Sequence, residues 1–572
     1  MSKRQLIQRE IPASTQLQGL HPLLARLYAA RGITSCNEVE YGLGRLHDVW
    51  QLKDIRRAAE QLFKALEQEK SIVIIGDFDA DGATSTALAM RGLSAMGFRK
   101  LDYLIPNRFD YGYGLSPEIV DVAARSKPDL IITVDNGIAN VSGVERARDH
   151  GIEVIVTDHH LPGATLPEAL AIVNPNQPGD KFPSKALAGV GVMFYLLVAL
   201  RNILRDAGWF TRKGFTEPNL AQYLDLVALG TVADVVPLDH NNRILVEQGL
   251  RRIRAGKACP GILALLTMAG KNPALARATD MGFIVGPRLN AAGRLEDMAF
   301  GIECLLTDSP QQAEHYAREL DNLNRERREI ESDMQSQALT LCNRLSLDEN
   351  TLPWGLALHQ EGWHQGVVGL VASRIKERYH RPVIAFADTG NDILKGSGRS
   401  IPGLHMRDAL ERIHSQHPGL IDKFGGHAMA AGLSLRQAAF RDFQQAFDTV
   451  VKAMLPAEKL NPVILSDGQL PGDELTMETA NLLQTCGPWG QAFPEPLFDG
   501  HFRIQQRRIL KEKHLKLTLT PANSNTPVDA IVFNINPDEW PEAGQNIHLA
   551  YTLDINRFRG SENLQLMVVE RF

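Results

Sequence analysis

The sequence predicts an α/β protein with a parallel sheet, followed by a second α/β domain and a C-terminal all-β domain. Between residues 71 and 240, short apolar runs alternate with segments of helical periodicity, and the runs themselves do not alternate apolar with polar residues. That combination is typical of parallel strands covered by helices on both faces. A second pattern of this kind starts at Leu356. From residue 460 onward, alternating strand-like runs follow one another without helices, as in a small barrel or sandwich.

A chain of 572 residues is too long for one hydrophobic core, so about three to four domains are expected. The predicted order is an N-terminal helical segment (1–50), a first α/β domain (51–305), a long connecting helix (306–345), a second α/β domain (346–455) and an all-β domain (456–572). In the first domain the predicted strands are the runs SIVIIG, DYLIP, DLIITV, EVIVT and ALAIVN. Helical periodicity between them covers residues 83–96, 117–125 and 141–150.

A long helix is predicted from Ser309 to Leu341. Ser309 can cap its first turn, and Pro310 fits the position that follows. Apolar residues recur at helical spacing along the segment, and the residues between them are mostly charged. A helix of this length spans roughly 50 Å. It is either a strut between two domains, which we favour because a second α/β pattern follows it, or a bundle helix inside one domain.

Composition and charge exclude several classes of protein. The chain is 44% hydrophobic and 22% charged, which favours a folded protein over a disordered one. Its net charge of −6 argues against binding nucleic acid over the whole surface, so a polyanion would need local basic patches or metal ions. Five scattered cysteines without a C-x-x-C pair argue against a disulfide framework and a structural zinc site. Because no signal peptide and no membrane-length apolar run is found, we expect a cytoplasmic protein with no membrane partner.

Three aspartates crowd the end of the first predicted strand, in the segment SIVIIGDFDADGATST. Asp77, Asp79 and Asp81 alternate along the chain, and their negative charges repel one another. The pattern D-x-D-x-D-G matches the start of a calcium-binding EF-hand loop, whose last ligand is a glutamate at the twelfth position. Counted from Asp77, that position holds Leu88, and the preceding run is strand-like, so an EF-hand is excluded. The repulsion among these three carboxylates must therefore be offset by a cation bound in another way than in an EF-hand.

Three further apolar runs end in acidic residues. DLIITVDNG leads to Asp135, EVIVTDHH to Asp158, His159 and His160, and DLVALGTVADVVPL to Asp234. The carboxyl ends of parallel strands share one edge of a sheet, where open α/β proteins bind ligands, so the four groups are predicted to converge. One aspartate after a strand is usually a helix cap. Four such sites, one of them triple and one joined to two histidines, are better explained by a common cation site.

The donor atoms of this cluster indicate which metal it binds. Oxygen ligands with one or two imidazoles and no thiolate suit Mg²⁺ or Mn²⁺ better than Zn²⁺ or copper. The number of carboxylates predicts two divalent ions about 3.5–4 Å apart, the spacing used for phosphoryl chemistry. The cluster is therefore interpreted as a two-metal site for hydrolysis of a phosphate ester, without a covalent nucleophile.

The motifs DFDADG, VDNG and TDHH together resemble the DHH phosphoesterase superfamily, and GSGRS with GGHAMAAG looks like its accessory DHHA1 domain. The stretches IPNRFDYGYG and GPRLNAAGR are similar to those of one branch, whose members degrade single-stranded DNA from the 5′ end. The order and number of the motifs extend the resemblance over nearly the whole chain, including a C-terminal OB-like domain. It implies single-stranded DNA as substrate, a monomer, and a helicase and a single-strand-binding protein as partners.

The resemblance also implies a set of site residues. The metal ligands carried over from the family are Asp79, Asp81, Asp135, His159 and Asp234. Many members carry a histidine four residues before the first ligand, where this chain has Ile75, so we expect Asp77 to supply the missing ligand or to bind through water. Behind the ligands, Asp158 would orient His159, and Asn136 would support the cluster. His160 would contact the scissile phosphate or assist proton transfer.

Substrate-binding residues follow from the same resemblance. The residues implied to hold the strand's phosphates, including its 5′ end, are Arg288, Ser397 and Arg399. Those implied to form a phosphate nest, facing the metals across a cleft, are Gly425, Gly426 and His427. Those implied to clamp and stack the nucleotides near the cut are Arg108 and Tyr113. The alternatives are close helix packing for the glycines and surface salt bridges for the arginines.

Residues 501–520 carry a run of basic side chains against one acid, Glu512. The basic residues are Arg503, Arg507, Arg508, Lys511, Lys513 and Lys516. Such a run is usually a solvated face. On a β-barrel with aromatic residues nearby it predicts a track for a single strand, because proteins that bind single strands combine a positive groove with stacking platforms.

The sequence therefore predicts a two-metal exonuclease that degrades single-stranded DNA 5′→3′ to 5′-mononucleotides in recombination and repair. The polarity and the preference for DNA come from the resemblance. Another phosphodiesterase of the superfamily, acting on short oligoribonucleotides, cyclic dinucleotides or pyrophosphate, is the first alternative, and the extra β domain argues against it. A non-catalytic replication scaffold is the second alternative, and the retained carboxylates argue against that.

Overall fold

The computed structural model describes residues 4–12, 17–107, 114–344, 352–558 and 560–572. Arg108 and Tyr113, predicted to contact nucleotides, lie outside the described residues. The chain divides into two compact units, each discontinuous in sequence. Glu10–Asn324 with Glu478–Pro496 forms the N-terminal unit, and Met1–Arg9, Arg325–Met477 and Leu497–Phe572 form the C-terminal unit. Among the described residues, no helix is both long and apolar enough to cross a membrane.

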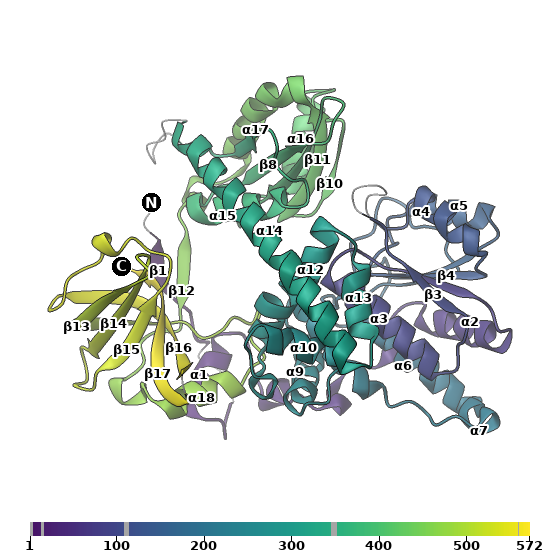
Figure 1. The fold of residues 1–572 in the computed structure, drawn as a ribbon, viewed down its shortest axis with the longest axis horizontal. Coiled ribbons are helices and arrows are strands. Elements are labelled where there is room, and N and C mark those ends of the chain that lie inside the picture. The colour runs from purple at the N-terminus through teal and green to yellow at the C-terminus, as the bar shows by residue number, and fades with distance from the viewer. Residues whose placement is uncertain (1–3, 13–16, 108–113, 345–351, 559) are drawn as a thin grey trace. The chain divides into compact units, whose positions relative to one another are not determined.

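The N-terminal unit is built on a five-stranded parallel sheet with the strand order β3-β2-β4-β5-β6. Figure 1 labels two of these strands, β3 and β4. Its strands are β2 (Ile72–Ile75), β3 (Leu101–Leu104), β4 (Leu130–Val134), β5 (Glu153–Thr157) and β6 (Ala171–Val173). In register, Ile74 lies beside Tyr103 on one side and Ile132 on the other. The five strands predicted from the runs SIVIIG, DYLIP, DLIITV, EVIVT and ALAIVN are confirmed, and so is their parallel pairing.

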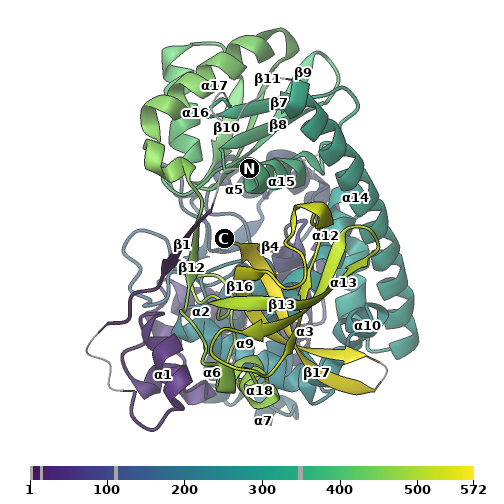
Figure 2. The same ribbon diagram turned by 90° about the vertical axis from the view of Figure 1, so that its left-hand side faces the viewer.

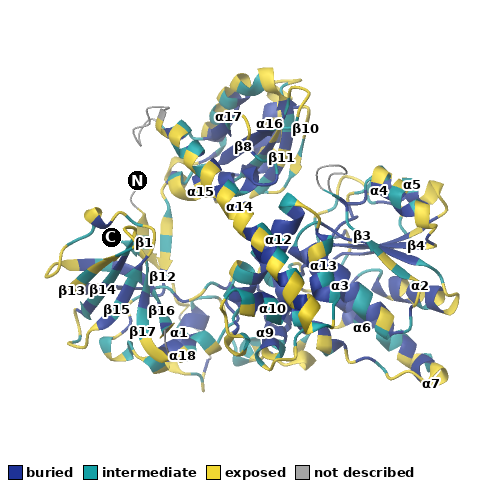
Figure 3. Cartoon of the chain, viewed as in Figure 1, coloured by how far each residue is buried: buried dark blue, intermediate teal, exposed yellow. Residues whose placement is uncertain are grey.

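Helices cover both faces of this sheet, and strand side chains alternate between two apolar cores. Val73, Ile131 and Val154 belong to one core, together with residues of α4 (Pro117–Ala123) and α5 (Val141–Asp149). On the other face, α3 (Ala80–Ala95) and α6 (Gly189–Asp206) pack against each other and against the strands. Figure 3 shows β4 buried along its length. Burial of both faces explains the unbroken apolar runs.

The remaining helices of this unit are α1 (Pro22–Ala29), α2 (Ile55–Glu67), α7 (Trp209–Lys213), α8 (Leu224–Ala233), α9 (His240–Arg254), α10 (Pro260–Met268), α11 (Ala278–Asp280), α12 (Gly286–Leu295), α13 (Ala299–Leu306) and α18 (Met477–Thr485). α8 corrects a prediction, because the sequence predicts a strand ending in Asp234 and the structure has a helix there. Every residue from Leu224 to Thr231 is buried, so the helix has no polar face. A run that is apolar all round carries no helical periodicity.

Residues 478–496 pack on the N-terminal helix of this unit, although they lie far away in the sequence. The hydroxyl of Tyr28 in α1 donates to the carbonyl of Cys486 (2.6 Å), and its ring centre lies 5.9 Å from that of Trp489. The guanidinium of Arg243 lies 4.3 Å from the ring centre of Phe493. The contacts of this segment therefore belong to the N-terminal unit, although the predicted boundary at residue 456 groups it with the all-β domain.

The first part of the C-terminal unit is a five-stranded mixed sheet of order β10-β11-β9-β8-β7. Its strands are β7 (Leu356–His359), β8 (Val383–Asp388), β9 (Ile393–Arg399), β10 (Lys423–Gly426) and β11 (Ala430–Arg436), and its helices are α15 (Val368–Tyr379), α16 (Met406–Gln416) and α17 (Phe440–Met454). β7 and β8 are parallel, and the other neighbours are antiparallel. Phe443 and Phe447 of α17 share a core with Ile384 of β8, whereas α15 packs against β8 and β9 outside that core.

The second part of the C-terminal unit is a closed barrel of order β13-β14-β15-β17-β16, whose strands are labelled in Figure 1. Its strands are β13 (Phe498–Leu510), β14 (His514–Pro521), β15 (Val528–Val532), β16 (Asn546–Phe558) and β17 (Ser561–Arg571). This barrel confirms the predicted C-terminal all-β architecture. Closure gives each of these strands a partner on both sides, which protects their edges from pairing with another chain.

Two segments join distant parts of the chain. α14 (Pro310–Arg344) is one continuous helix of 35 residues, as predicted, and the boundary between the units falls inside it, after Asn324. At 1.5 Å per residue such a helix is about 52 Å long. β1 (Gln5–Gln8) pairs in parallel with β12 (Val463–Ser466), so the start of the chain lies beside the segment that precedes the barrel (Figures 1 and 2).

Candidate active site

The strand order creates a switch point between β2 and β4. β3 lies on one side of β2 and β4 on the other, so the connections that follow β2 and β4 leave in opposite directions. Open α/β sheets bind ligands at such a point, outside the carboxyl ends of the strands. Asp77, Asp79 and Asp81 follow β2, and Asp135 follows β4. The predicted cluster therefore lies where this topology leaves room for a ligand.

Backbone N–H groups hold the first aspartate motif in place. Asp79 is the N-cap of α3, and its carboxylate accepts hydrogen bonds from the N–H groups of Asp81 and Gly82, both 3.0 Å long. Asp81 is only 1% exposed, and its two oxygens accept from the first N–H groups of α6, those of Gly189 (2.6 Å) and Val190 (3.0 Å). The positive end of α6 therefore stabilises one carboxylate of the cluster.

Asp135 is held at the junction of the central strands. Its backbone is left-handed (φ 64°), and its N–H donates to the carbonyl of Thr157 (3.0 Å) in β5. The side-chain amide of Asn136 donates to the carbonyls of Ile75 (3.1 Å) and Val134 (2.9 Å). Asn136 thus fixes the spacing of β2 and β4 where both deliver their carboxylates.

His159 lies among the carboxylates. Its Nε2 is 3.1 Å from Asp135, 3.4 Å from Asp234 and 4.0 Å from Asp81. Asp234 is the residue at the end of α8, so it reaches the cluster from a helix and not from a strand edge. Three sets of side chains each bring their donor atoms within 4.8 Å of one another: Asp77, Asp79 and Asp135; Asp81, His159 and Asp234; and Asp135, His159 and His160.

These donor sets fit hard divalent cations. They supply carboxylate oxygens and imidazole nitrogens but no thiolate, the combination that favours Mn²⁺ or Mg²⁺ over softer metals. Ile75 is fully buried in β2, and Asp77 belongs to one of the sets. Asp77 is therefore placed to supply an oxygen where related chains are expected to use a histidine.

Burial and mutual repulsion shift the pKa values of these carboxyl groups. For Asp81, burial and the charge of Asp79 raise the pKa to about 7, against the opposing effect of the α6 N–H donors. Burial and the charges of Asp81 and Asp79 raise the pKa of both Asp135 and Asp234 well above the usual range. A divalent cation would remove this penalty, because its charge favours the ionised form of every group around it.

Asp158 orients His160, whereas the sequence predicts that it orients His159. Its Oδ1 lies 2.8 Å from Nδ1 of His160, and its bond to His159 goes to the backbone N–H (2.7 Å). The tight turn after Asp158 explains the difference. The backbone N–H groups of His159 and His160 both donate to the carboxylate of Asp158, and of the two rings it is that of His160 that folds back to the same oxygen. Burial alone would raise the pKa of Asp158, but the hydrogen bond and charge of His160, the charge of His159 and the N–H of Ile138 together bring the pKa to about 2. Burial alone would lower the pKa of His160, but the same bond together with the charges of Asp158, Asp234 and Asp77 raises it to about 9.

Two asparagines without a predicted role position the two histidines. The side-chain amide of Asn174 donates to the carbonyl of His160 (3.0 Å), and that of Asn176 donates to the carbonyl of His159 (2.6 Å). Both follow β6, the fifth predicted strand. The same rule that located the acids, that strand ends share one edge, would have found them if amides had been considered with carboxylates.

α12 contacts the first aspartate motif through a glycine, and this contact gives a testable prediction. A Cβ on Gly293 would lie 1.8 Å from the carbonyl oxygen of Phe78, a backbone atom with little freedom to move. We expect Gly293→Ala to displace the loop between β2 and α3, lowering the free energy of unfolding by about 1–3 kcal/mol and weakening metal binding. Thermal unfolding and Mn²⁺ titration measure both effects.

The matched control is Gly42→Ala, where the added Cβ meets open space. A Gly293→Ala protein as stable as that control would show that the contact is not tight.

Ser397 and Arg399 lie together on β9 in the C-terminal unit. Nη1 of Arg399 donates to Oγ of Ser397 (3.0 Å), and both residues are half-buried. The start of α15 comes close to them, since a Cβ on Gly369 would lie 2.8 Å from Nη2 of Arg399 and 2.9 Å from Oγ of Ser397. A guanidinium, a hydroxyl and a helix N-terminus therefore meet, and each of these groups binds phosphate.

The GGHAMAAG segment forms a β-hairpin between β10 and β11, which removes the alternative of helix packing. Gly426 has a φ of 139°, and a Cβ there would lie 2.4 Å from the backbone of Ala431. Gly425 pairs with Gly432, and Gly432 pairs with Ser397. Small residues therefore adjoin Ser397 across three strands. His427 is exposed in the connection between β10 and β11.

Arg288 forms a buried ion pair, which the sequence did not predict. It is 7% exposed, and its Nε donates to Asp321 of α14 (3.0 Å) while its Nη1 donates to the carbonyl of Ile284 (2.8 Å). A second nitrogen, Nη2, also lies 2.8 Å from Asp321. The guanidinium thus anchors α12 to the first part of α14, and Arg288 and Arg399 occupy different surroundings.

The predicted basic run forms the β13–β14 hairpin of the barrel. Arg503, Arg508, Lys511 and Lys513 are exposed. Arg508 lies directly opposite Lys516 across the hairpin, so two like charges face each other there.

Two members of the basic run are engaged within the barrel. Arg507 donates to the carbonyl of Pro537 (3.0 Å), and Lys516 pairs with Asp529 (2.8 Å). An aromatic surface lies beside the hairpin, because Phe533 is 48% exposed and its ring centre is 5.1 Å from that of His514. Exposed cations and an exposed ring therefore occur together on this part of the barrel.

Comparison with protein families assigns the three parts of the chain. The DHH family, N-terminal domain, matches residues 71–231, the DHHA1 domain matches residues 352–453, and the RecJ OB domain matches residues 466–570. These spans contain the cluster of aspartates and histidines, the Ser397–Arg399 pair and the barrel, respectively, except that Asp234 lies just beyond the first span.

Relatives and solved structures match the chain from end to end. The single-stranded-DNA-specific exonuclease RecJ of Escherichia coli K12 is 56% identical over 566 residues, which cover 99% of this chain and 98% of the relative. The crystal structure of RecJ in complex with Mn²⁺ from Thermus thermophilus matches with a TM-score of 0.80 and 31% identity, covering 100% of this chain and 79% of that one. The structure of RecJ with Mg²⁺ from the same organism matches with a TM-score of 0.74 and 29% identity, covering 100% and 78%.

Proposed function

The chain belongs to the RecJ family, and on that premise we propose that it is a single-stranded-DNA-specific exonuclease that works with two divalent cations, Mn²⁺ or Mg²⁺. The observation that carries this proposal is the convergence of all implied ligands at the switch point, in donor sets whose atoms lie within 4.8 Å of one another. Relatives of high identity indicate the substrate, since they are single-stranded-DNA-specific exonucleases by name.

The cluster residues have distinct roles in this proposal. The side chains that would hold the two cations are Asp77, Asp79, Asp81, Asp135, His159 and Asp234. When bound, such a pair lowers the pKa of water and stabilises charge on a phosphate. His160 would donate a hydrogen bond to the scissile phosphate, and Asp158 holds its ring for that contact. Asn174 and Asn176 keep both histidine backbones in place, so that the donor atoms need no rearrangement when the substrate binds.

We assign the 5′-terminal phosphate of the strand to Ser397 and Arg399, with Gly425, Gly426 and His427 in the neighbouring hairpin. An enzyme that holds a terminal 5′-phosphate removes 5′-mononucleotides one after another, which gives the 5′→3′ polarity implied by the resemblance. The helix N-terminus beside Arg399 supports the assignment, because a phosphate monoester carries more negative charge than a backbone phosphate.

The cellular setting belongs to the same proposal. Recombination and repair, a monomeric chain, and a helicase and a single-strand-binding protein as partners are supported by the family resemblance. The cytoplasm suits the cysteines, all five of which are free thiols.

Digestion of end-labelled strands tests the proposed function directly. Single- and double-stranded DNA and RNA, labelled at the 5′ or the 3′ end, are incubated with Mn²⁺, Mg²⁺ or EDTA. We expect the 5′ label to be released first, as a mononucleotide, from single-stranded DNA and only with metal. Equal release from both ends, or activity in EDTA, would overturn the proposal. Preference for short oligoribonucleotides or cyclic dinucleotides would favour the alternative phosphodiesterase.

Arg399 and Arg288 are expected to respond differently to substitution. Arg399→Ala should raise KM for a 5′-phosphorylated strand by roughly 10- to 100-fold, the worth of a charge-assisted hydrogen bond, and leave metal affinity unchanged. Arg399→Lys should recover only part of this, because lysine lacks the planar fork. Steady-state kinetics on strands with a 5′-phosphate or a 5′-hydroxyl separate this effect from a general loss.

Arg288→Ala is expected to affect stability, whereas Arg399→Ala affects the kinetics. The Arg288 substitution leaves Asp321 buried without its cation, so the main effect should be a loss of about 3–5 kcal/mol of stability. If Arg399→Ala left the kinetics unchanged, Arg399 would be an ordinary surface cation.

The barrel hairpin is expected to hold the strand by charge. For single strands the slope of log K against log salt is about −0.7 per phosphate neutralised, so replacing Arg503, Arg508, Lys511 and Lys513 by alanine should make it shallower by up to about 2.8. Point substitution is preferable to truncation, because residues 478–496 belong to the N-terminal unit and β12 pairs with β1. Binding of a long oligonucleotide in EDTA across a salt series measures the slope.

The control for this prediction is Arg436→Ala with Arg441→Ala, which removes two exposed cations of the same unit. Equal slopes for all proteins would indicate a partner-docking barrel.

A further inference from the structure

A basic hollow lies on the N-terminal unit beside the start of α2. It measures about 710 Å³ and is lined by the first turn of α2, the short helix Val49–Gln51 and the loop after β6. Its charged lining consists of Lys53, Arg56, Arg57 and Lys181 against Asp54 and Glu60. None of the proposed catalytic residues lines it. Its excess of positive charge contrasts with the net charge of −6 on the whole chain.

The cations of this hollow remain available to a ligand. Arg57 and Lys181 are exposed, and neither forms an ion pair with a residue that the structure describes. Lys53 uses one of its three donor positions for the carbonyl of Pro178 (2.8 Å). Asp180, an acid of the same loop, is paired with Lys185 (2.6 Å). The local field is therefore positive, which raises the concentration of anions at this surface.

The start of α2 adds to that field. Two of the first three helical residues are arginines and none is acidic, although the positive end of a helix dipole favours acids. Asp54 precedes the helix with a left-handed backbone (φ 60°), and its side chain caps no N–H group. The repulsion between the two arginines and the positive end of the α2 dipole destabilises the folded protein in the absence of a ligand. An anion bound in the hollow would offset that repulsion.

A flat surface lies beside these charges. The guanidinium of Arg56 is 4.1 Å from the ring centre of Trp50, so a planar cation covers an indole ring. Arginine planes and aromatic rings are the surfaces on which unpaired nucleobases stack. An acidic peptide would use the cations but not this plane. The combination favours a single-stranded nucleic acid as the ligand.

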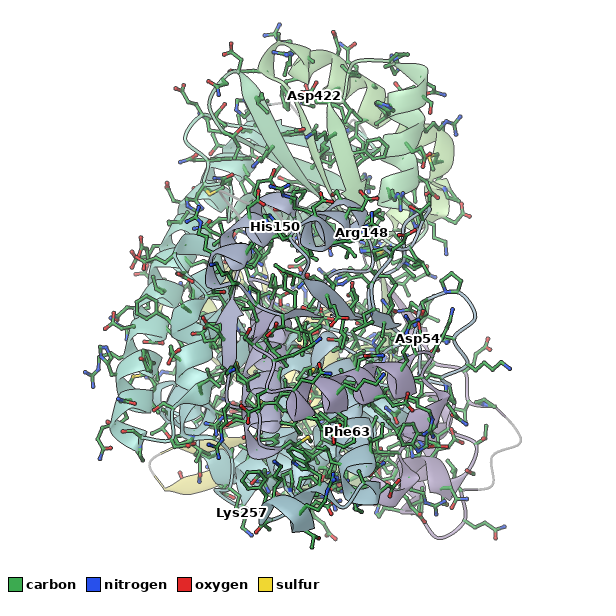
Figure 4. The ribbon with its side chains drawn as sticks, turned by 90° about the vertical axis from the view of Figure 1, so that its right-hand side faces the viewer. Asp54, Phe63, Arg148, His150, Lys257 and Asp422 are labelled. Carbon is green, nitrogen blue, oxygen red and sulfur yellow. The ribbon has the colours of Figure 1, made fainter. Side chains whose placement is uncertain are left out.

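The hollow also lies close to the metal-ligand cluster. Asn176 donates to the carbonyl of His159 (2.6 Å), and Gly179, three residues further along the same loop, lines the hollow. Three residues span at most about 11 Å. Figure 4 shows Asp54 at the surface, where α2 begins. A strand that enters the cluster is therefore within a few nucleotides of this hollow.

We propose that this hollow is an additional binding site for the single-stranded DNA substrate, holding nucleotides a few positions from the one being cleaved. Backbone phosphates contact Lys53, Arg57 and Lys181, and a base stacks on the Arg56–Trp50 pair. The identity of the ligand rests on the proposed function, whereas the charge, the stacking surface and the position of the hollow do not.

Charge reversal in the full-length protein tests this proposal. Arg57→Glu with Lys181→Glu should weaken binding of a long oligothymidylate in EDTA by at least about tenfold and make its salt slope shallower by about 1.4, the value for two lost phosphate contacts. Trp50→Ala should weaken binding by roughly 5- to 100-fold, whereas Trp50→Phe should retain part of the affinity because it keeps a ring. All of the substituted side chains lie at the surface or only partly inside it, and thermal unfolding verifies that each variant is folded.

A matched control exists at the opposite edge of the same sheet. Arg99 and Lys100 are exposed beside the start of β3 and line a different hollow, so Arg99→Glu with Lys100→Glu makes the same change of charge. This control should leave affinity and salt slope unchanged. Equal weakening by both double variants would mean that only overall charge matters, and would overturn the proposal.

Two further outcomes separate this inference from the proposed function. If the wild-type protein neither binds nor cleaves single-stranded DNA, the proposed function fails. If the wild type binds and cleaves but the Arg57/Lys181 variant has unchanged affinity, the hollow alone is misassigned. A fluorescent decaglutamate peptide is the remaining probe. Loss of peptide binding with full retention of DNA affinity would overturn the proposal in favour of an acidic protein segment.

Discussion

Asp135→Asn is expected to lower turnover by at least about 10³-fold, because removing one member of a catalytic unit disables the whole unit. Two of the three donor sets contain Asp135, so this one substitution removes a charged oxygen from both of them. The same substitution should make the metal-free protein more stable. Burial and the charges of Asp81 and Asp79 raise the pKa of Asp135, and a neutral amide removes that repulsion.

Three measurements check this expectation: cleavage of single-stranded DNA, Mn²⁺ binding by calorimetry, and thermal unfolding in EDTA. Asp149→Asn, an exposed aspartate at the end of α5, is the control and should change none of them. Asp79→Ala and His159→Ala should share the loss of cleavage. If metal binding and turnover survived in any two of these three cluster variants, the metal site would have to be placed elsewhere.

Without metal, the stability of the N-terminal unit is expected to fall as pH rises from about 4 to about 7. The pKa of Asp81 is 3.8 in its unperturbed form and is raised to about 7 in the fold, first by burial and then by Asp79. A group with a raised pKa binds more protons in the folded state than in the unfolded state across this window. Its stabilising contribution is therefore complete below the lower value and is lost as pH rises through the upper one. The expected loss is several kcal/mol, on the order of 5–10 °C in melting temperature.

Saturating Mn²⁺ should reverse this trend, because the cation competes with protons for the same oxygens and binds more tightly as pH rises. Melting curves between pH 4 and pH 8, with EDTA or with Mn²⁺, give the two slopes. Asp135→Asn should flatten the EDTA curve, since it removes one of the coupled groups. A metal-free protein that became more stable toward pH 8 would contradict the crowding of carboxylates described here.

Much of the site could be predicted from the sequence because two simple regularities determine it. Apolar runs such as those that end before Asp77 and Asp135 are long enough only for strands, and parallel strands deliver their ends to one edge. Charged residues at those ends are conspicuous in the printed sequence. The five strands, the convergence of the acids and the choice of a hard cation all follow from these two facts.

The remaining features depend on contacts that a sequence does not display. Asp234 is predicted at a strand end because the run Leu224–Thr231 is buried on all sides, and such a run looks the same in a strand and in a helix. The partner of Asp158 depends on how a tight turn folds back on itself. The ion pair of Arg288 depends on α14, which follows in the sequence but meets α12 only after folding.

The pairing of β1 with β12 determines how early in synthesis the protein can finish folding. Gln8 pairs with Ser466, so β1 has no partner until roughly 460 further residues have been made. At about 5–20 residues per second, that wait lasts roughly 20–90 s. Tyr28 waits about as long, since its partner Cys486 lies 458 residues further along the chain. If synthesis stops before β12 has been made, β1 has no strand to pair with. Such incomplete chains are expected to be degraded.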